Sequence, residues 1–418
     1  MKIKEFSNKY DLSYDTIRYY MKLNLINPQK SGGHYEFDQE DQNDIEEILK
    51  LKEMEFSLDE IKEILSFKRI GRLSNYQKNS YYQDLYQGKL KKIEKRIIEL
   101  KEAKKSLNLH LKRLKDENNE KQNDLSLNLN LLKLFACPDC GSDLTLSAEK
   151  IENNRIHQGS LNCSCGEKIL IKEGVLYTKE VYEQQNQEEV FETDPLFHVT
   201  DYIQQTDSEF MDQSYQSLEW LKNRINFTDL KNKVILEPGS GYGLLLRNIY
   251  DQLPSDTTYI CVEHSPELNR YLKSLLELSP AGPEVIFLTA ELPNLPLKEK
   301  SIDYLIDFSG ISNFSFHNQG FLPELISKYL KDHFMMTAIF IIYHKFGEKN
   351  IVERKYREFF MYSNIRLKLK EMGLEFLDEY KSEIKKIDTS MGKYEEFAQI
   401  GDQIYSYQIH AKKAETKK

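Results

Sequence analysis

Four of the five cysteines in this 418-residue chain lie close together, between residues 137 and 165. Cys137 and Cys140 form a Cys-x-x-Cys pair, and Cys163 and Cys165 follow with one residue between them. Thiolates at this density need a cation, and four cysteines typically hold Zn²⁺ in a tetrahedral structural site. We therefore expect zinc at these four residues, with His157 as a substitute ligand because the second pair is unusually close. Four buried thiols or a redox pair are the alternatives.

The stretch VILEPGSGYGLLLRNIY, residues 234–250, joins an apolar strand to an apolar helix through a glycine-spaced turn. Gly239, Gly241 and Gly243 would let the main chain approach a ligand closely. A dinucleotide-binding turn would place its third glycine at position 244, where this chain has Leu244. The spacing therefore disfavours a dinucleotide as the ligand.

From residue 195 onward, apolar runs alternate with helical sequence, which predicts an α/β fold with a parallel sheet and right-handed crossovers. Ligands of such sheets bind at the carboxyl ends of the strands, where the glycine turn falls. The most apolar run, FMMTAIFIIY at residues 334–343, is too short to cross a bilayer and is expected to be a buried parallel strand. No secretory signal begins the sequence, so a cytoplasmic protein is expected.

With Glu237 before it, EPGSGYG resembles motif I of the class I S-adenosylmethionine-dependent methyltransferases. Glu263, at the end of ICVE, stands where that family has the acid that accepts hydrogen bonds from the ribose hydroxyls. The resemblance spans about residues 195–412 and implies a Rossmann-like seven-stranded sheet, whose last two strands often form an antiparallel hairpin. The cofactor-binding residues that it implies are Glu237, Gly239, Gly241, Gly243, Glu263, Ala290, Glu291, Asp307 and Phe308.

Methyl transfer in this fold depends largely on positioning the nucleophile, so few side chains are obligatory. His317, in SNFSFHNQG, lies where a base often lies in that family, and His264 and His344 are further candidates. The alternative for each is a structural or solvent-exposed histidine.

Residues 1–75 predict helix, turn, helix, hairpin and two more helices, with Ser13 as a helix N-cap and SGGHYEF as the hairpin. TIRYYMKLNLINP, the glycine-containing wing, FDQED and LKEMEFSLDEIKEIL resemble the winged helix-turn-helix of the MerR family of bacterial transcription regulators. The resemblance implies that the helix from Ser13 enters the major groove of double-stranded DNA. In the wing, Glu36 departs from the Gly-Tyr-Arg usual in that family. A helical protein-interaction module is the alternative.

The residues expected to contact DNA come from this helix, its flanks and the wing. They are Tyr14, Asp15, Thr16, Arg18, Tyr19, Lys22, Lys30, His34 and Tyr35. Before position 36, basic side chains outnumber acidic ones. We therefore expect this surface to contact the DNA phosphates. The net charge of −9 argues only against a surface that binds polyanions over the whole chain.

A heptad stripe follows, in alternating steps of three and four residues, interrupted by Lys104. Its members are Leu90, Ile93, Ile97, Leu100, Lys104, Leu107, Leu111 and Leu114. A second copy would bury this stripe, so we expect a homodimer, as in the MerR family, and a palindromic promoter site. Packing on later domains of the same chain is the alternative.

These patterns divide the chain into five segments. They are a winged helix-turn-helix at 1–76, a dimerisation helix at 77–118, a linker at 119–134, a zinc ribbon at 135–180 and a methyltransferase domain at 181–418 that opens with a further linker at 181–195. The ribbon, over about residues 135–178, resembles the small zinc domain fused to, or partnered with, S-adenosylmethionine methyltransferases.

Three functions fit this organisation. The first is a transcription regulator whose fused methyltransferase senses and methylates a small molecule. The second is a regulator in which the methyltransferase fold is a receptor for S-adenosylmethionine or another ligand, without turnover. The third is an rRNA or tRNA methyltransferase that uses the ribbon and the winged helix to bind RNA. The intact glycine turn and ribose acid favour the first function over the second, and the MerR-like head disfavours the third.

Overall fold

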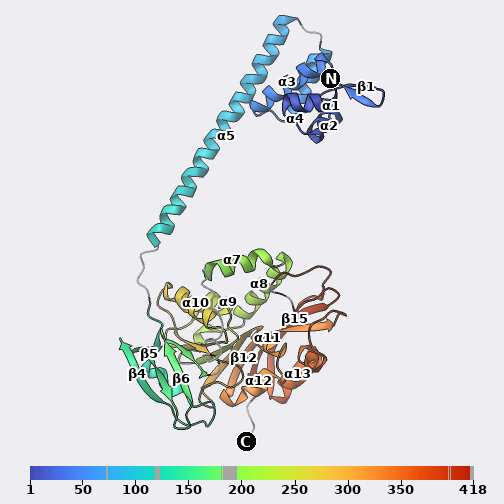
Figure 1. Ribbon diagram of the computed structural model, residues 1–418. Helices are drawn as coiled ribbons and strands as arrows, with labels where there is room; N and C mark the ends of the chain where they lie inside the picture. Colours follow the sequence, from blue (N-terminus) through green and yellow to red (C-terminus); the bar gives the residue numbers. More distant parts are fainter. Residues whose placement is uncertain are drawn as a thin grey trace. The chain divides into compact units, whose positions relative to one another are not determined.

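The computed structural model describes residues 1–71, 74–117, 123–179, 181, 195–393, 395 and 397–414. Contacts divide the chain into two compact units, Met1–Asn119 and Glu120–Lys418 (Figure 1). The expected linker at 181–195 lies almost entirely outside the described residues. No described helix has the length and apolar character needed to cross a membrane.

The first unit follows the predicted order of helix, turn, helix, hairpin and two helices. Its elements are α1 (Ile3–Tyr10), α2 (Tyr14–Lys22), β1 (Gln29–Ser31), β2 (His34–Glu36), α3 (Gln39–Glu53), α4 (Leu58–Ile70) and α5 (Asn75–Glu117). Ser13 is the N-cap of α2, as predicted: its hydroxyl accepts the main-chain N–H of Thr16 at 3.1 Å. Strands β1 and β2 pair antiparallel and form the expected hairpin.

One apolar face of each short helix fills the core of this unit. The core includes Phe6, Ile17, Tyr20, Phe37, Ile45, Ile48, Ile61 and Ile64, all at most 2% exposed. Ion pairs from Lys89 (2.8 Å) and Lys92 (3.0 Å) in α5 to Glu60 join this helix to α4. Hydrogen bonding to Lys89 is the largest cause that lowers the pKa of Glu60 to about 2.

The heptad stripe runs along α5 and is largely exposed in the single chain. Its members Leu90, Ile97, Leu100, Leu107 and Leu111 are between 45% and 65% exposed. The side chain of Leu114 lies outside the described ones. An isolated helix with such a stripe would leave it in water, where burial against a second surface is favourable.

The second unit is built on one mixed sheet with helices around it. The strands that carry the glycine turn and its neighbours are β8 (Val234–Pro238), β9 (Thr258–Glu263), β10 (Glu284–Thr289), β11 (Ile302–Phe308), β12 (Leu330–Lys345), β13 (Leu374–Lys381), β14 (Lys385–Lys386) and β15 (Gln403–Lys413). Their order across the sheet is β13-β15-β12-β11-β8-β9-β10, with β14 beside β15. Strands β12, β11, β8, β9 and β10 run parallel, and β15 is antiparallel to β12 and β13. The run at 334–343 is thus a parallel strand, as predicted.

The crossovers and flanks are helical. They are α7 (Pro195–Gln205), α8 (Ser208–Lys222), α9 (Leu244–Ile249), α10 (Pro266–Glu277), α11 (Gly310–Ser315), α12 (Leu322–Leu325) and α13 (Tyr362–Glu371), with 3₁₀ turns η1 (Leu129–Leu134), η2 (Phe227–Leu230), η3 (Tyr250–Gln252), η4 (Ser327–Tyr329) and η5 (Arg354–Phe360). Buried apolar clusters lie between these helices and the sheet.

The cysteine-bearing segment belongs to the same sheet. Its strands are β3 (Leu127–Asn128), β4 (Thr145–Glu152), β5 (Arg155–Asn162), β6 (Lys168–Lys172) and β7 (Val175–Tyr177). They continue the sheet from β10, because β7 pairs with β10 in parallel. The sheet of the described residues therefore has thirteen strands, where a seven-stranded sheet and a separate ribbon were expected. Arg155 secures the joint with a bidentate ion pair to Glu284 at 2.9 and 3.0 Å.

The expectation of a linker at 119–134 is wrong for its described part, residues 123–134. Leu127, Leu131 and Leu134 are buried in the core that this segment shares with the sheet. The side-chain amide of Asn128 donates to Glu284 at 3.0 Å. The asparagines that suggest a solvated connector therefore lie between leucines that pack on the sheet.

Candidate functional site

The glycine turn follows β8 and has a backbone that side chains disfavour. Gly239, Gly241 and Gly243 have φ angles of +65°, +53° and +71°, in the left-handed region where a Cβ atom is strained. At Gly243 an added Cβ would also lie 2.2 Å from the side chain of Leu272. At Gly241 it would meet nothing within 4 Å, so the main chain there is open to a ligand.

Glu263, at the end of β9, is bound to this turn. Its Oε2 accepts the main-chain N–H of Gly241 at 2.9 Å, and its Oε1 accepts that of Ser265 at 3.0 Å. Burial would raise the pKa of Glu263, but His264, 2.8 Å away, and the two main-chain donors outweigh burial and lower it. The carboxylate is therefore charged, and Oε2, which accepts one main-chain N–H, keeps a lone pair for a further donor such as a hydroxyl.

Two more carboxyls are buried beside the turn. Glu237, at the end of β8, accepts the hydroxyl of Tyr259 at 2.8 Å, and Asp307, in β11, accepts the main-chain N–H of Ile311 at 2.9 Å through Oδ1. Burial is the main cause that raises the pKa of each to about 8, and Asp307 and Glu263 add repulsion at Glu237. The Oδ2 atom of Asp307 is buried without a hydrogen-bond partner.

Gly310 allows the end of β11, which carries Asp307, to lie close to the glycine turn. A Cβ atom at Gly310 would lie 1.8 Å from the carbonyl oxygen of Pro238, and one at Gly239 would lie 3.0 Å from the Cα of Gly310. The ends of β8 and β11 therefore pack main chain to main chain. The structure thus brings together Glu237, the three glycines, Glu263 and Asp307 at the carboxyl ends of adjacent strands, where ligands of open α/β sheets bind.

The remaining cofactor candidates surround this cluster less closely. Ala290 is buried, and its N–H donates to the carbonyl oxygen of Glu263 at 3.3 Å. Glu291 is exposed and adds to the rise in the pKa of His264. Phe308 is half-buried at the end of β11.

The histidine candidates do not enter the cluster as free bases. His317 is exposed in the turn after α11, and His344 is exposed near the end of β12. His264 is exposed and pairs with Glu263, whose hydrogen bond is the largest cause that raises the pKa of His264. No described contact places His317 against the carboxyl cluster.

The cluster fits S-adenosylmethionine on its chemistry. Glu237, Glu263 and Asp307 are buried acids, and no described lysine or arginine pairs with any of them. Buried carboxyls without a cation are costly, and a cationic ligand would relieve that cost. S-adenosylmethionine carries a sulfonium and an ammonium group, and its ribose hydroxyls suit the charged Glu263. The side chains present therefore suit a cationic nucleoside.

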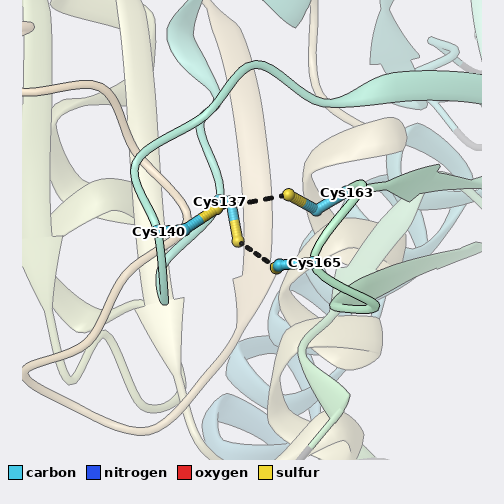
Figure 2. A group of neighbouring side chains, drawn as sticks. All are labelled: Cys137, Cys140, Cys163 and Cys165. Atoms are coloured by element: carbon cyan, nitrogen blue, oxygen red, sulfur yellow. Dashed lines mark hydrogen bonds between the residues drawn. The ribbon is translucent and has the colours of Figure 1, made fainter.

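The four predicted metal ligands do come together. The sulfur atoms of Cys137, Cys140, Cys163 and Cys165 all lie within 4.8 Å of one another, with Cys137 to Cys165 at 3.5 Å and Cys140 to Cys163 at 3.4 Å (Figure 2). A tetrahedral zinc site with Zn–S bonds of about 2.3 Å separates sulfurs by about 3.8 Å, so the cluster fits zinc. His157 is not a substitute ligand: its ring contacts Asp124 at 3.2 Å and Ser126 at 3.1 Å.

The predicted DNA-contacting residues of the first unit are exposed, except Thr16. In α2, Ile17 and Tyr20 face the core, whereas the predicted contacts on the helix point outward. The exposed ones are Tyr14, Asp15, Arg18, Tyr19, Lys22, Lys30, His34 and Tyr35, and Thr16 is half-buried. Arg18 has a side chain 69% exposed and a weak contact of 3.6 Å to Asp15, so its guanidinium is available to another anion.

Sequence reasoning missed several polar residues of the second unit. Tyr259, which holds Glu237, and Asn269, whose buried amide donates to Thr289 at 3.0 Å, lie beside the predicted site. Tyr202 and Glu395 form a further pair at 2.6 Å. The continuous apolar run of β9 could have marked Tyr259 as buried, but nothing in the sequence pairs positions 202 and 395.

The fold joins a helix-turn-helix unit to an α/β unit built on one mixed sheet. Residues 1–68 match the model of the MerR HTH family regulatory proteins, so the chain carries a MerR-family head. No curated protein matches the chain.

Solved structures similar to the chain include methyltransferases, some of them S-adenosylmethionine-dependent. One from Aquifex aeolicus has 15% identity over 56% of this chain and 97% of its own, with a TM-score of 0.32. The complex of the Haloferax volcanii Trm112 methyltransferase activator with a methyltransferase has 15% identity over 47% and 90%, with a TM-score of 0.31. The geranyl diphosphate C-methyltransferase from Streptomyces coelicolor has 10% identity over 48% and 76%, with a TM-score of 0.36. These values are too low to indicate a substrate for this chain.

Proposed function

We propose that the chain is a MerR-type transcription regulator whose second unit binds S-adenosylmethionine and methylates a small molecule. The observation that carries the second half is the cluster of Glu237, Glu263 and Asp307 around the left-handed glycine turn. When bound, the cofactor supplies a methyl group made electrophilic by the sulfonium. The protein's part is to accept the ribose hydroxyls at Glu263, to stabilise positive charge with the other two acids and to exclude water from the glycine turn.

The DNA-binding half of the proposal is supported by the family match and the exposed face of α2. In this proposal Arg18, Tyr19 and the outward residues at the start of α2 meet base edges and phosphates in the major groove. Lys30 and Tyr35 of the hairpin reach the flanking backbone, where the Lys30 ammonium lies 5.8 Å from the Tyr35 ring centroid.

The exposed stripe on α5 supports a homodimer. Two copies related by a two-fold axis would each bury this stripe, and their heads would bind a palindromic promoter site. Zinc at the four cysteines has a structural role in this proposal, because all four coordination positions are filled by protein thiolates.

A receptor without turnover is the second candidate, and the exposure of the histidine candidates favours it. The two functions differ in what the protein carries and makes. Purified protein should contain S-adenosylmethionine or S-adenosylhomocysteine by mass spectrometry, and calorimetry should show binding of both. S-adenosylhomocysteine formed from added S-adenosylmethionine in the presence of cell extract indicates turnover. Binding without product formation under any extract supports a receptor for S-adenosylmethionine, and no binding of either nucleoside would refute both that receptor and the methyltransferase.

A further inference from the structure

A tyrosine–glutamate pair with a buried carboxyl lies outside the predicted site. The hydroxyl of Tyr202, in α7, donates to Oε1 of Glu395 at 2.6 Å. Glu395 is 7% exposed, and Tyr202 is its one hydrogen-bond partner among the described residues. A buried carboxyl held by a single neutral donor needs an explanation beyond packing.

The segment that contains Glu395 lies at the carboxyl ends of the parallel strands. Strand β15 begins at Gln403, opposite Lys345 at the end of β12, so the residues just before β15 lie on the side where the glycine turn lies. The Tyr343 hydroxyl, near the same end of β12, donates to the carbonyl oxygen of Phe397 at 2.6 Å. Glu395 therefore lies beside the ligand-binding edge of the sheet.

The other side of the segment is joined to α7 and reaches the glycine turn. Thr206, which follows α7, forms an isolated bridge with Gly392. The hydroxyl of Thr206 lies beside that of Tyr202, and Tyr242 of the glycine turn is close enough to contribute a small rise to the pKa of Tyr202. Residues from α7, from the segment before β15 and from the cofactor turn thus converge on one point.

A second tyrosine–glutamate pair in the same unit has the hydrogen bonds and the cation expected of a carboxylate with a purely structural role. Glu379 accepts the hydroxyl of Tyr407 at 2.5 Å and is also held by two hydrogen bonds from Arg366, both at 2.9 Å. The Arg366 contact is the largest cause that lowers the pKa of Glu379. This carboxylate is charged and satisfied, as expected of a structural ion pair.

Glu395 has no such compensation. Of the charged side chains nearby, Lys393 and Asp201 contact each other at 3.4 Å, and no described cation pairs with Glu395. Burial raises the pKa of Glu395 to about 7, against a smaller lowering by Tyr202. Carboxyls that change charge near neutral pH are typical of groups that exchange protons with a substrate.

Aromatic rings surround the same segment. The ring of Phe397 lies 6.2 Å from that of Phe210 and 5.6 Å from that of Phe316, and all three residues are half-buried. Phe316 directly follows α11, the helix that begins beside Asp307. An apolar, ring-bearing molecule would be compatible with these surfaces.

We propose that Glu395, oriented by Tyr202, accepts the proton of the methyl acceptor, and that this acceptor is a weakly acidic hydroxyl on an aromatic body. The proposal rests on the methyltransferase function proposed above. The hydroxyl proton passes to Oε2 of Glu395 while the oxygen lone pair forms the bond to the methyl carbon and the carbon–sulfur pair stays on sulfur as a neutral thioether. Tyr202 is a positioning residue, and Glu395 returns its proton to solvent.

The titration can be tested without any activity. A free glutamate has a pKa of about 4.3, so the folded protein holds an extra proton on Glu395 between about pH 5 and pH 7. Wild-type protein should therefore lose more stability across this range than Glu395→Gln, which lacks this carboxyl. The melting temperature of Glu395→Gln should therefore rise relative to wild type as the pH increases. Glu379→Gln is the matched control, and it should instead be less stable than wild type at neutral pH.

The acceptor can be tested with para-nitrophenol, whose ionised form absorbs visible light. Protein loaded with S-adenosylhomocysteine should bind it and convert it to phenolate near neutral pH. Glu395→Gln should bind S-adenosylhomocysteine unchanged but lose the phenolate signal at least tenfold, whereas Tyr202→Phe should shift its pH midpoint. An equal signal in Glu395→Gln, a melting difference that does not vary with pH, or wild-type binding of an aniline in place of the phenol would overturn the proposal. Failure of wild type to bind S-adenosylhomocysteine would instead refute the methyltransferase function.

Discussion

The main-chain N–H of Gly241 donates to Oε2 of Glu263 at 2.9 Å, so the glycine turn after β8 and the tip of β9 are held together by one side chain. The same carboxylate caps the turn before α10 through Ser265 at 3.0 Å. Glu263 therefore has two roles in the proposed site, as an acceptor for the ribose hydroxyls and as the anchor of the turn.

Glu263→Ala should weaken binding of S-adenosylhomocysteine by about tenfold to a hundredfold. Hydrogen bonds to a charged group are worth about 1.5 to 3 kcal/mol each, and about 1.4 kcal/mol is a factor of ten. Isothermal calorimetry measures the change. Glu299→Ala is the control, because Glu299 is an exposed glutamate of the same unit outside the predicted site and its removal should cost little affinity. Equal binding by the two variants would show that Glu263 does not contact the cofactor.

The pH dependence of binding should distinguish the sulfonium from the thioether. Glu237 and Asp307 have pKa values of about 8, so both are largely protonated at neutral pH in the free protein. A sulfonium favours their charged forms, and its binding should release protons. Affinity for S-adenosylmethionine relative to S-adenosylhomocysteine should therefore rise from about pH 6 to about pH 9, by at most about tenfold per pH unit for each carboxyl.

Whereas cofactor affinity should rise with pH, the stability of the free protein should fall, because of the same two carboxyls, Glu237 and Asp307. Their folded-state pKa values are raised, so the folded state binds more protons than the unfolded state from about pH 4 to about pH 8, and stability falls as the pH rises through that range. Asp307→Asn should reduce this fall in a thermal melt and also flatten the pH dependence of binding. An affinity ratio that does not change with pH would contradict the role given to these acids.

Metal removal should destabilise the second unit as a whole. Cys137 and Cys163 begin loops that flank strands of the shared sheet, and β7 of this segment pairs directly with β10. Elemental analysis should find about one zinc per chain, and a strong chelator should lower the melting temperature by more than about 5 °C. Cys140→Ser should reduce the zinc content. Cys261→Ala should not, because Cys261 is buried in β9, outside the cluster.

Sequence patterns located the local features of the fold and missed those that depend on distant pairing. The N-cap at Ser13, the hairpin and the strand at 334–343 follow from short-range preferences, which are legible in a few residues. Residues 123–134 look like a connector because asparagines alternate with leucines there. These residues are held in place by pairing with β5 and by a hydrogen bond to Glu284, both distant in sequence.

The site shows the same division. The glycine turn and Glu263 carry motif-like spacing, and the structure brings them into contact. The burial of Glu237 and Asp307 without cations, and the meeting of Tyr202 with Glu395, are properties of the assembled sheet edge. No local sequence pattern encodes the lack of a counter-charge, since that depends on every neighbour in space.

Arg18→Ala should weaken promoter binding by about 1 to 3 kcal/mol without changing cofactor affinity or thermal stability. Its side chain is 69% exposed and makes one weak contact, so the fold should lose little. Arg96→Ala is a matched control, because Arg96 in α5 is equally exposed and pairs with Glu99 at 3.4 Å in the same i,i+3 arrangement. Fluorescence anisotropy with promoter DNA at fixed salt separates the two variants. Equal losses would show that removing any exposed positive charge accounts for the effect.

Substitutions at two leucines of α5 can test whether the heptad stripe is the dimer interface. Leu111 lies on the heptad stripe and is 56% exposed, whereas Leu109, two positions earlier and hence on the opposite face, is 54% exposed. If a second copy covers the stripe, Leu111→Lys places a charge in the interface, and light scattering should show a shift from dimer to monomer at micromolar concentration.

Leu109→Lys should remain dimeric, because the side chain at position 109 is in water both in the single chain and in the proposed dimer. Loss of the dimer should also weaken binding to a two-site promoter fragment far more than binding to a half-site, since the second head would no longer be held nearby. A dimer that survives Leu111→Lys, or one disrupted equally by both substitutions, would mean that the exposed leucines of α5 do not form the seam and that the heptad spacing has another cause.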